Sequence, residues 1–582
     1  MSKVQGNLFP HKSRRGSCYA TKVTVLCLLA LVVAFSTSIL KLFNIQIQVN
    51  IIHDLKAQTK STPEKFKTCS PPLPTLLASH PPRPDAPRLK EAAASLHDFL
   101  STRTAESDID SLSIAVVTPD GPIFEAGYGV LRANESEPEK RGSITRDSIY
   151  RIASITKMFA VLETLILRER GLLNWDDPVT KFLPNFTNPT YGWSDFLNGN
   201  EYTSKHAPIT LRQLASHLSG IGRDYPPVDV GETWPAPIFP EDKGAVHELR
   251  ERINGSREEL LDAVAILPLV APPYTFPVYS NTGFDVLGLC NAAAGKLGYR
   301  ELMERDVFEP LAMKSSFYPA QVAVPSSDSE VADLTFDLVN DPSGGQYSSL
   351  ADLVAVMQTL LSPKETGVIS PYVVREWLRP LHSWSDGFRE TGAPWEMERV
   401  AGEARLYTKG GNLPGYHSQF VLNPQWSYGI VVLVTGNYTD TATLAAEAIS
   451  RFQPAFESLL LMQVFYAYAG VWVGDDSVAV ITIEDQALYL QTLIVGDSDV
   501  LSLLQRNPSE GGKAVALWST GRPHEFRLAI GRPELNNNPD AGCEPYWISL
   551  DFPFSRGAPL DLLYWDGSEL VYPSAGVRLR RD

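Results

Sequence analysis

The chain has 582 residues, of which 44% are hydrophobic and 20% charged, a composition typical of a globular protein with two or three folded units. Its net charge of −16 excludes a nucleic-acid-binding protein, because that function needs a basic face. A negative net charge otherwise affects the solubility of the protein and does not identify a binding partner.

The N-terminal segment has the pattern of a membrane anchor. Residues 1–22 carry five Lys or Arg side chains and no Asp or Glu, and residues 23–40 form an apolar run of 18 residues. As a helix this run spans about 27 Å, close to the roughly 30 Å core of a bilayer. We therefore expect a cytoplasmic tail over 1–22, a transmembrane signal anchor over 23–43, and a lumenal or extracellular remainder. A cleaved signal peptide, which would give a secreted protein, is the alternative.

Sequons and cysteines fit a chain that enters the secretory pathway. One disulfide with one thiol left over is expected among Cys69, Cys290 and Cys543, and Cys69–Cys290 is the pairing we favour. No cysteine pair has the C-x-x-C spacing of a structural zinc site, and no metal or other cofactor is implied. Candidate N-glycosylation sites are Asn134, Asn185, Asn254 and Asn437.

Residues 44–87 are expected to form a stalk. Eight prolines lie between residues 63 and 87, and this density favours extended polyproline structure over helix or strand. The folded part should therefore begin at about residue 88.

Helices and strands then alternate as in an α+β domain. A long helix is predicted from Ser154 to Gly171, and its apolar faces predict a buried central position. Another helix should begin with Asp177 as N-cap. Further helices are predicted at 89–100, 211–220, 258–266, 282–297 and 440–451, and strands at 113–117, 123–128, 404–408, 419–422 and 428–434. The last three strands should be neighbours in one antiparallel sheet, with a turn at 412–416.

The character of the chain changes after Pro454. Alternating apolar segments separated by turn residues predict an all-β domain from about 465 to 582. Its predicted strands are 478–483, 488–493, 514–518, 526–530 and 547–552.

The candidate active site begins with Ser154-Ile155-Thr156-Lys157. Residues three apart share one face of a helix, so the Ser154 hydroxyl and the Lys157 amine are predicted neighbours. Burial of that face would let the amine lose its proton and activate the hydroxyl as a nucleophile. The motif alone is weak, because Ser38 and Lys41 repeat it inside the apolar N-terminal run.

Two later motifs fit the same chemistry. Tyr279-Ser280-Asn281 precedes a predicted helix, and Lys409-Gly410-Gly411 ends a predicted strand. Taken singly, Tyr279 would be a core residue and Lys409 the partner of a surface carboxylate. In this order with the first motif, they favour one serine–lysine acyl-transfer site.

The order and spacing of the three motifs resemble the serine β-lactamase and penicillin-binding-protein superfamily, in particular its class C-like branch, which includes esterases and acyltransferases. Flanking stretches at 214–220, 344–349 and 415–416 look like the same branch, and the resemblance covers about 88–452. It implies a β-lactamase/transpeptidase-like α/β (α+β) fold, with an antiparallel sheet flanked by helices, followed by the C-terminal all-β domain at 465–582. The stalk and β tail resemble secreted or anchored proteins of filamentous fungi.

The resemblance also implies a role for each motif residue. Ser154 would attack a carbonyl carbon while Lys157 and Tyr279 share the transfer of its proton, and the sequence leaves open which of the two is the base. The oxyanion would lie between the backbone N–H groups of Ser154 and Asn412. The expected substrate-binding residues are Asn281, Lys409, Gly410, Gly411 and Asn412.

Gly410 departs from the Lys-Thr-Gly or Lys-Ser-Gly of penicillin-binding proteins. It lacks the hydroxyl that helps to hold a substrate carboxylate, so the expected substrate moves from β-lactams towards esters or thioesters. We expect a serine hydrolase that forms an acyl-enzyme with a small-molecule ester or amide. His217 and His417 are expected to be structural or to contact the reacting residues without taking part in the reaction. An acyltransferase and an inactive anchored binding protein are the alternatives, and the sequence does not define the oligomeric state.

Overall fold

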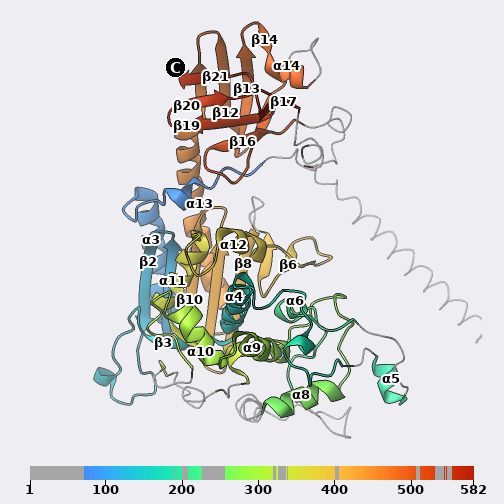
Figure 1. Cartoon of the computed structure of the whole chain (residues 1–582). Helices are drawn as coiled ribbons and strands as arrows, with labels where there is room; N and C mark the ends of the chain where they lie inside the picture. Colours follow the sequence, from blue (N-terminus) through green and yellow to red (C-terminus); the bar gives the residue numbers. More distant parts are fainter. Residues whose placement is uncertain are drawn as a thin grey trace, which may run out of the picture.

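The computed structural model describes residues 71–189, 192–199, 207–225, 256–318, 323–325, 336, 339–399, 405–505, 512–530, 543, 546 and 553–582. Figure 1 shows a larger body of helices and sheet and a smaller β body, joined by the long helix α13 (Thr441–Tyr468). Within the described ranges, no helix combines the length and apolar character needed to cross a bilayer. The predicted anchor at 23–43 lies outside them.

The larger body is built on an antiparallel sheet with the strand order β2-β1-β10-β9-β8-β7-β6-β5. The N-terminal hairpin pairs with strand β10, in a register that sets Leu112 opposite Val434. The three predicted late strands are neighbours, although β8 continues to Leu413, so Asn412 lies in a strand and not in a turn. The strands are β1 Ile109–Thr118, β2 Gly121–Gly129, β5 His382–Ser383, β6 Arg389–Thr391, β7 Glu396–Arg399, β8 Arg405–Leu413, β9 Tyr416–Asn423 and β10 Tyr428–Gly436.

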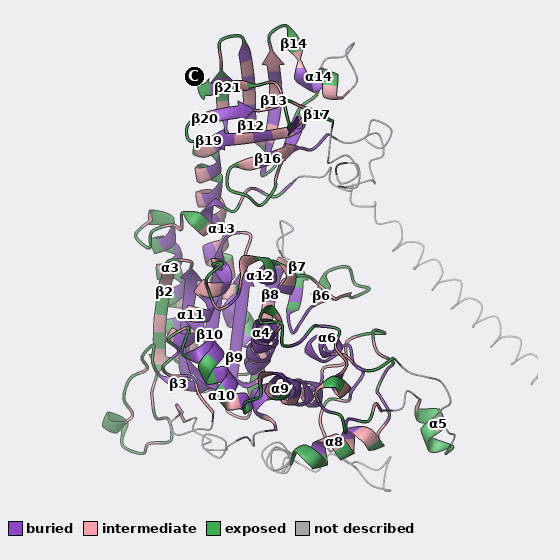
Figure 2. Cartoon of the chain, viewed as in Figure 1, coloured by how far each residue is buried: buried purple, intermediate pink, exposed green. Residues whose placement is uncertain are grey.

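Both faces of this sheet are covered, which explains why β10 is a continuous apolar run. Val431 and Leu433 belong to one hydrophobic core, together with helices α4 (Thr156–Glu169), α9 (Asn281–Gly295) and α11 (Leu350–Leu361). Ile430 and Val432 belong to a second core with α3 (Pro87–Arg103) and α13. Strands β9 and β10 are buried along their length, and helix α4 is buried from Thr156 to Leu167 (Figure 2). Helix α4 is therefore central, as predicted.

The remaining elements surround these two cores. Helices are α3 Pro87–Arg103, α4 Thr156–Glu169, α5 Trp193–Leu197, α6 Leu211–Ala215, α8 Arg257–Ile266, α9 Asn281–Gly295, α10 Tyr299–Met303, α11 Leu350–Leu361 and α12 Pro371–Trp377. Short strands β3 Ile149–Arg151 and β4 Tyr347–Ser349 pair with each other. The π-helical turn η6 (Asp341–Gly345) leads into β4.

Helix α13 is longer than predicted. It was expected to end before Pro454, but it runs for 28 residues through this proline to Tyr468. A proline inside a helix costs about 3 kcal/mol. Burial of Phe452, Phe456 and Leu460 in the second core offsets that cost, at about 2 kcal/mol for each large apolar side chain.

Two predictions for the N-terminal part are wrong. Residues 71–87 are folded and not an extended stalk, because Leu73, Leu76 and Leu77 are buried in the second core and helix α2 (Leu76–Ser79) forms there. The helix predicted from Asp177 is only the 3₁₀ turn η3 (Val179–Lys181). Here the Val179 N–H donates to the Ile209 carbonyl, which draws the chain away from a helical path.

The predicted disulfide between Cys69 and Cys290 is also wrong. Cys290 is a free thiol buried on α9, where the apolar surroundings raise its pKa. Cys543 takes part in a disulfide.

The smaller body is an antiparallel barrel. Its strand order is β12-β11-β21-β20-β19-β16-β15-β13-β14, and the additional pairing of β12 with β13 closes the sheet. The predicted strands at 478–483 and 488–493 are the hairpin β12–β13, while 547–552 lies outside the described residues. The strands are β11 Gly470–Val473, β12 Ser477–Glu484, β13 Ala487–Val495, β14 Ser498–Asp499, β15 Val515–Ser519, β16 Glu525–Leu528, β19 Leu562–Asp566, β20 Glu569–Tyr572 and β21 Val577–Arg581.

Candidate active site

Ser154 lies in a tight turn and not in the helix itself. The 3₁₀ turn η2 (Ala153–Ile155) precedes α4, so the predicted helix start moves from Ser154 to Thr156. Ala153 has φ of 47°, a left-handed conformation that costs roughly 1–2 kcal/mol in a residue other than glycine. Such strain is characteristic of functional turns, and here it immediately precedes the candidate nucleophile.

Lys157 is fully buried in the first turn of α4, and its amine has three partners. Nζ lies 3.1 Å from Ser154 Oγ, 2.7 Å from Asn281 Oδ1 and 2.5 Å from the Ser343 carbonyl oxygen. The amide and carbonyl oxygens can only accept, so they take two amine protons. The remaining position faces Ser154 Oγ, and a neutral amine presents its lone pair there.

The Lys157 pKa is lowered. Burial is the main cause, and the nearby Lys409 ammonium adds to it, although the Tyr279 phenolate opposes both. Asn281 is fixed in turn, because its Nδ2 donates to Asp224 Oδ1 over 2.6 Å. The pocket therefore favours a neutral Lys157 held in a defined position.

Tyr279 lies among three basic side chains. Lys157 Nζ and Lys409 Nζ lie 5.0 Å and 5.2 Å from its ring centroid, and the Arg223 guanidinium lies 4.8 Å from it. Burial raises the Tyr279 pKa, but the two lysines and a hydrogen bond with Ser154 outweigh it, so the pKa falls to about 8. Part of the Tyr279 population is thus ionised near neutral pH.

Lys409 reaches this cluster from β8. Its Nζ donates to Glu396 Oε1 over 2.7 Å and to the Gly410 carbonyl over 2.9 Å. Burial lowers its pKa, but the charges of Tyr279 and Glu396 outweigh burial and the net shift is upward. Lys409 is therefore a fixed positive charge beside Tyr279.

The strand β8 brings its backbone against the nucleophile. A Cβ on Gly411 would lie 2.9 Å from the Ser154 backbone nitrogen and 2.3 Å from the Ile152 oxygen, so only glycine fits. Strand β7 pairs with β8 only as far as Thr408. Residues 409–413 consequently offer an edge without a β7 partner beside Ser154, where substrate can pair with backbone groups.

Two histidines that the sequence did not single out as functional also contact residues of the site. His217, with φ of 62°, stacks on Tyr279 at 4.5 Å between ring centroids. Its Nδ1 accepts the Ser280 N–H at 3.0 Å, and burial together with the neighbouring lysines holds its pKa well below the usual value. It is a neutral ring packed on the candidate base. His417 Nδ1 lies 2.8 Å from Asn412 Oδ1.

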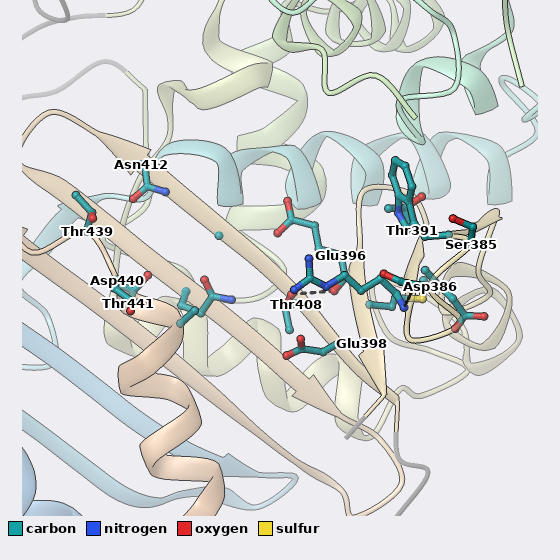
Figure 3. Close-up of a pocket in the computed structure, with 17 residues that line it drawn as sticks. Ser385, Asp386, Thr391, Glu396, Glu398, Thr408, Asn412, Thr439, Asp440 and Thr441 are labelled. Carbon is teal, nitrogen blue, oxygen red and sulfur yellow. Dashed lines mark hydrogen bonds between the residues drawn. The ribbon is translucent and has the colours of Figure 1, made fainter. Parts of the chain in front are cut away.

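Most of the predicted site residues therefore meet. Ser154, Lys157, Tyr279, Asn281, Lys409 and Gly411 form one cluster. The side-chain positions of Gly410 and Asn412 line a cavity on the other face of β8 (Figure 3). Asp224, Ser343 and Glu396 were missed as members of the site, and none of them lay in a stretch with a recognisable pattern. His217, in the stretch 214–220, was expected to be structural or to contact the reacting residues, and it stacks on Tyr279. Of the predicted glycosylation sites, Asn134, Asn185 and Asn437 are exposed, and Asn254 lies outside the described residues.

Comparison with known proteins places this site in a family. The model of the family described as Beta-lactamase matches residues 96–452, more than half of the chain, and the chain therefore belongs to the beta-lactamase family. The predicted β-lactamase/transpeptidase-like fold is confirmed, and the family supports a function of the serine hydrolase type.

Individual relatives and solved structures resemble this chain to different degrees. A beta-lactamase-like protein of Strobilurus tenacellus is 35% identical over 304 residues, which cover 49% of this chain and 98% of that protein. A probable hydrolase of Phoma sp. is 22% identical over 461 residues, 74% of each protein. Among solved structures, the octameric penicillin-binding protein homologue from Pyrococcus abyssi gives a TM-score of 0.48 at 17% identity, covering 84% of this chain and 99% of that chain.

Proposed function

We propose that this protein is a serine hydrolase that works through an acyl-enzyme on Ser154, with an ester or amide of a small metabolite as substrate. The observation that carries the proposal is the 3.1 Å contact between Lys157 Nζ and Ser154 Oγ, in a site where the other two amine contacts are pure acceptors. This arrangement supports loss of the hydroxyl proton to the Lys157–Tyr279 pair.

In the proposed acylation step, Ser154 Oγ forms a bond to the substrate carbonyl carbon as its proton passes to Lys157 or Tyr279. The carbonyl oxygen takes the electron pair of the C=O bond and accepts hydrogen bonds from the backbone N–H groups of Ser154 and Asn412. When the tetrahedral intermediate collapses, the bond to the leaving group breaks and that group takes the proton. Water repeats the sequence in the second half and releases the acid.

The geometry supports a shared base. Lys157 and Tyr279 share a proton near neutral pH. When Lys157 carries it, the charges of Lys157 and Lys409 lower the Tyr279 pKa to about 8, and when Tyr279 carries it, burial favours a neutral Lys157. A proton from Ser154 can therefore be held by either group, with the fixed charge of Lys409 stabilising the phenolate.

The charges beside Lys409 favour substrates without a carboxylate. Glu396 lies beside Lys409, the residue that would otherwise bind an acid group. A free substrate carboxylate would meet this negative charge. Neutral esters or thioesters are therefore the expected class.

Two functions are alternatives to the hydrolase: one uses the same catalytic site, and the other involves no catalysis. An acyltransferase would replace water by an alcohol or amine in the second half of the reaction. An inactive binding protein, anchored through residues 23–43, is disfavoured by the complete cluster of Ser154, Lys157 and Tyr279. The anchor itself stays a proposal from the sequence.

A burst assay with p-nitrophenyl butyrate tests the proposal. The wild-type chain should release one equivalent of p-nitrophenol rapidly and then turn over, and a fluorophosphonate probe should label it. Ser154→Ala should abolish the burst, turnover and labelling, whereas Ser38→Ala, in the other S-x-x-K sequence, is the matched control and should retain all three. Absence of turnover and labelling in the wild type would refute the proposed function.

A further inference from the structure

A cavity of about 730 Å³ is lined by residues of β7, β8 and β9 and of the start of α13 (Figure 3). Successive strand residues alternate between faces, and Gly411 points at the Ser154 backbone, so Gly410 and Asn412 point the other way. The start of α13, at Asp440 and Thr441, forms a second wall of the cavity. The volume is that of a small-molecule site.

A buried amide in this cavity has no partner. Gln419, on β9, is only 8% exposed and lines the cavity, yet its side chain makes no hydrogen bond to any residue that the structure describes. A Cβ on Gly410 would lie 3.0 Å from Gln419 Oε1, which places the amide directly over Gly410. The amide nitrogen and oxygen are accessible from the cavity, so a ligand there can donate to the oxygen or accept from the nitrogen.

The lining is strongly acidic. Glu390 and Glu396 are paired, with Arg405 at 2.6 Å and Lys409 at 2.7 Å, whereas Glu398 forms no ion pair within the described chain. Arg389 supplies a single opposing charge. The carboxylates that line the cavity are Asp386, Glu390, Glu396, Glu398 and Asp440.

Two of these acids are placed to act together. Glu396 and Glu398 are two residues apart on β7 and therefore share a face of the strand. Trp384, which is 37% exposed, adds an aromatic surface to the lining. Carboxylates and an indole in the lining of one cavity favour an organic cation, which gains from both charge and the ring face.

We propose that this cavity binds a small organic cation of the primary-ammonium class, held by Glu396 and Glu398 and by the amide of Gln419. Binding itself does not depend on the proposed hydrolase activity. It is a second site, since Ser154, Lys157 and Tyr279 do not line it.

The cavity is coupled to the candidate active site through one side chain. Glu396 lines the cavity and also accepts the Lys409 Nζ, and its charge raises the Tyr279 pKa. An ammonium group beside Glu396 offsets that charge and lowers the Tyr279 pKa. The bound amine then increases the phenolate fraction near neutral pH, and this regulatory part rests on the proposed function.

Calorimetric titration of the full chain with putrescine at low salt tests the binding, with 1,4-butanediol as the neutral control. We expect saturable binding of putrescine and none of the diol. Glu398→Gln should weaken binding at least fivefold, and Gln419→Met, of similar size, severalfold. Glu484→Gln, an acid on the barrel, is the matched control and should leave the Kd unchanged. The proposal is overturned if the diol binds as tightly as putrescine, if putrescine shows no saturable binding, or if neither cavity variant weakens putrescine binding.

A second measurement separates this inference from the proposed function. Putrescine should bind Ser154→Ala as tightly as the wild type, and it should shift the lower limb of the wild-type acylation profile to lower pH. Binding without any acylation of the wild type would refute the hydrolase and leave the cation site standing. Acylation of the wild type without putrescine binding would support the hydrolase and overturn the cation site. If putrescine binds but the lower limb of the pH profile stays in place or moves to higher pH, the coupling between the two sites is overturned.

Discussion

Replacing Lys409 by methionine removes the fixed charge beside Tyr279 while nearly preserving its length. The Lys409 ammonium lies 5.2 Å from the Tyr279 ring centroid. At an effective dielectric constant of about 20 this distance corresponds to about 3 kcal/mol, or roughly two pKa units. The Tyr279 pKa, now about 8, should therefore rise to roughly 10 in Lys409→Met.

Activity requires the deprotonated base, so a raised pKa removes activity at low pH first. The lower limb of the pH profile should move up by about one to two units, and acylation at pH 7 should slow by about ten- to a hundredfold. Lys409 also lowers the Lys157 pKa, so the direction is the same if Lys157 is the base.

Stopped-flow acylation by p-nitrophenyl butyrate between pH 5 and pH 10 measures the shift. Lys181→Met, which removes a surface lysine paired with Asp177, should leave the limb in place. If the lower limb of the pH profile of Lys409→Met coincides with that of the wild type, the titrating base does not lie beside Lys409.

The other predictions concern the base, the nucleophile turn and the linking helix. Tyr279→Phe should lower the acylation rate by about a hundredfold or more, because it removes one of the two proton acceptors; a rate within threefold of wild type would assign the base to Lys157 alone. Gly411→Ala should lower the melting temperature and abolish turnover, because its Cβ would meet the Ser154 backbone nitrogen at 2.9 Å. Gly410→Ala should be milder, because the nearest atom to its Cβ is the side-chain oxygen of Gln419 at 3.0 Å; equal effects of the two variants would contradict the assigned orientation of β8. Pro454→Ala should raise the melting temperature of the full chain, since Pro454 is exposed inside α13 and the change is worth up to about 3 kcal/mol; an unchanged or lower value would refute that estimate.

The contacts that the sequence predicted correctly are those governed by short-range geometry or by motif order. Ser154 and Lys157 meet because three residues make almost one helical turn, even though η2 delays the helix start. Tyr279, Asn281 and Lys409 were found by their order along the chain, and the fold brings them to α4.

What the sequence missed depends on long-range contacts. The Ser343 carbonyl binds Lys157 across 186 residues, and a backbone oxygen carries no residue-specific signal. Glu396 and Asp224 are ordinary acids until the fold sets them against Lys409 and Asn281. Helix α13 continued past Pro454 because tertiary burial outweighed local helix propensity.

The central claim is a covalent acyl-enzyme on Ser154. Intact-mass measurement after rapid acid quench, across a panel of esters, thioesters and β-lactams, tests it most directly. We predict a mass gain equal to one acyl group with at least one ester or thioester, mapped to the peptide that contains Ser154, and no gain in Ser154→Ala. An adduct on another residue, or no adduct in the wild type with any member of the panel, would contradict the account.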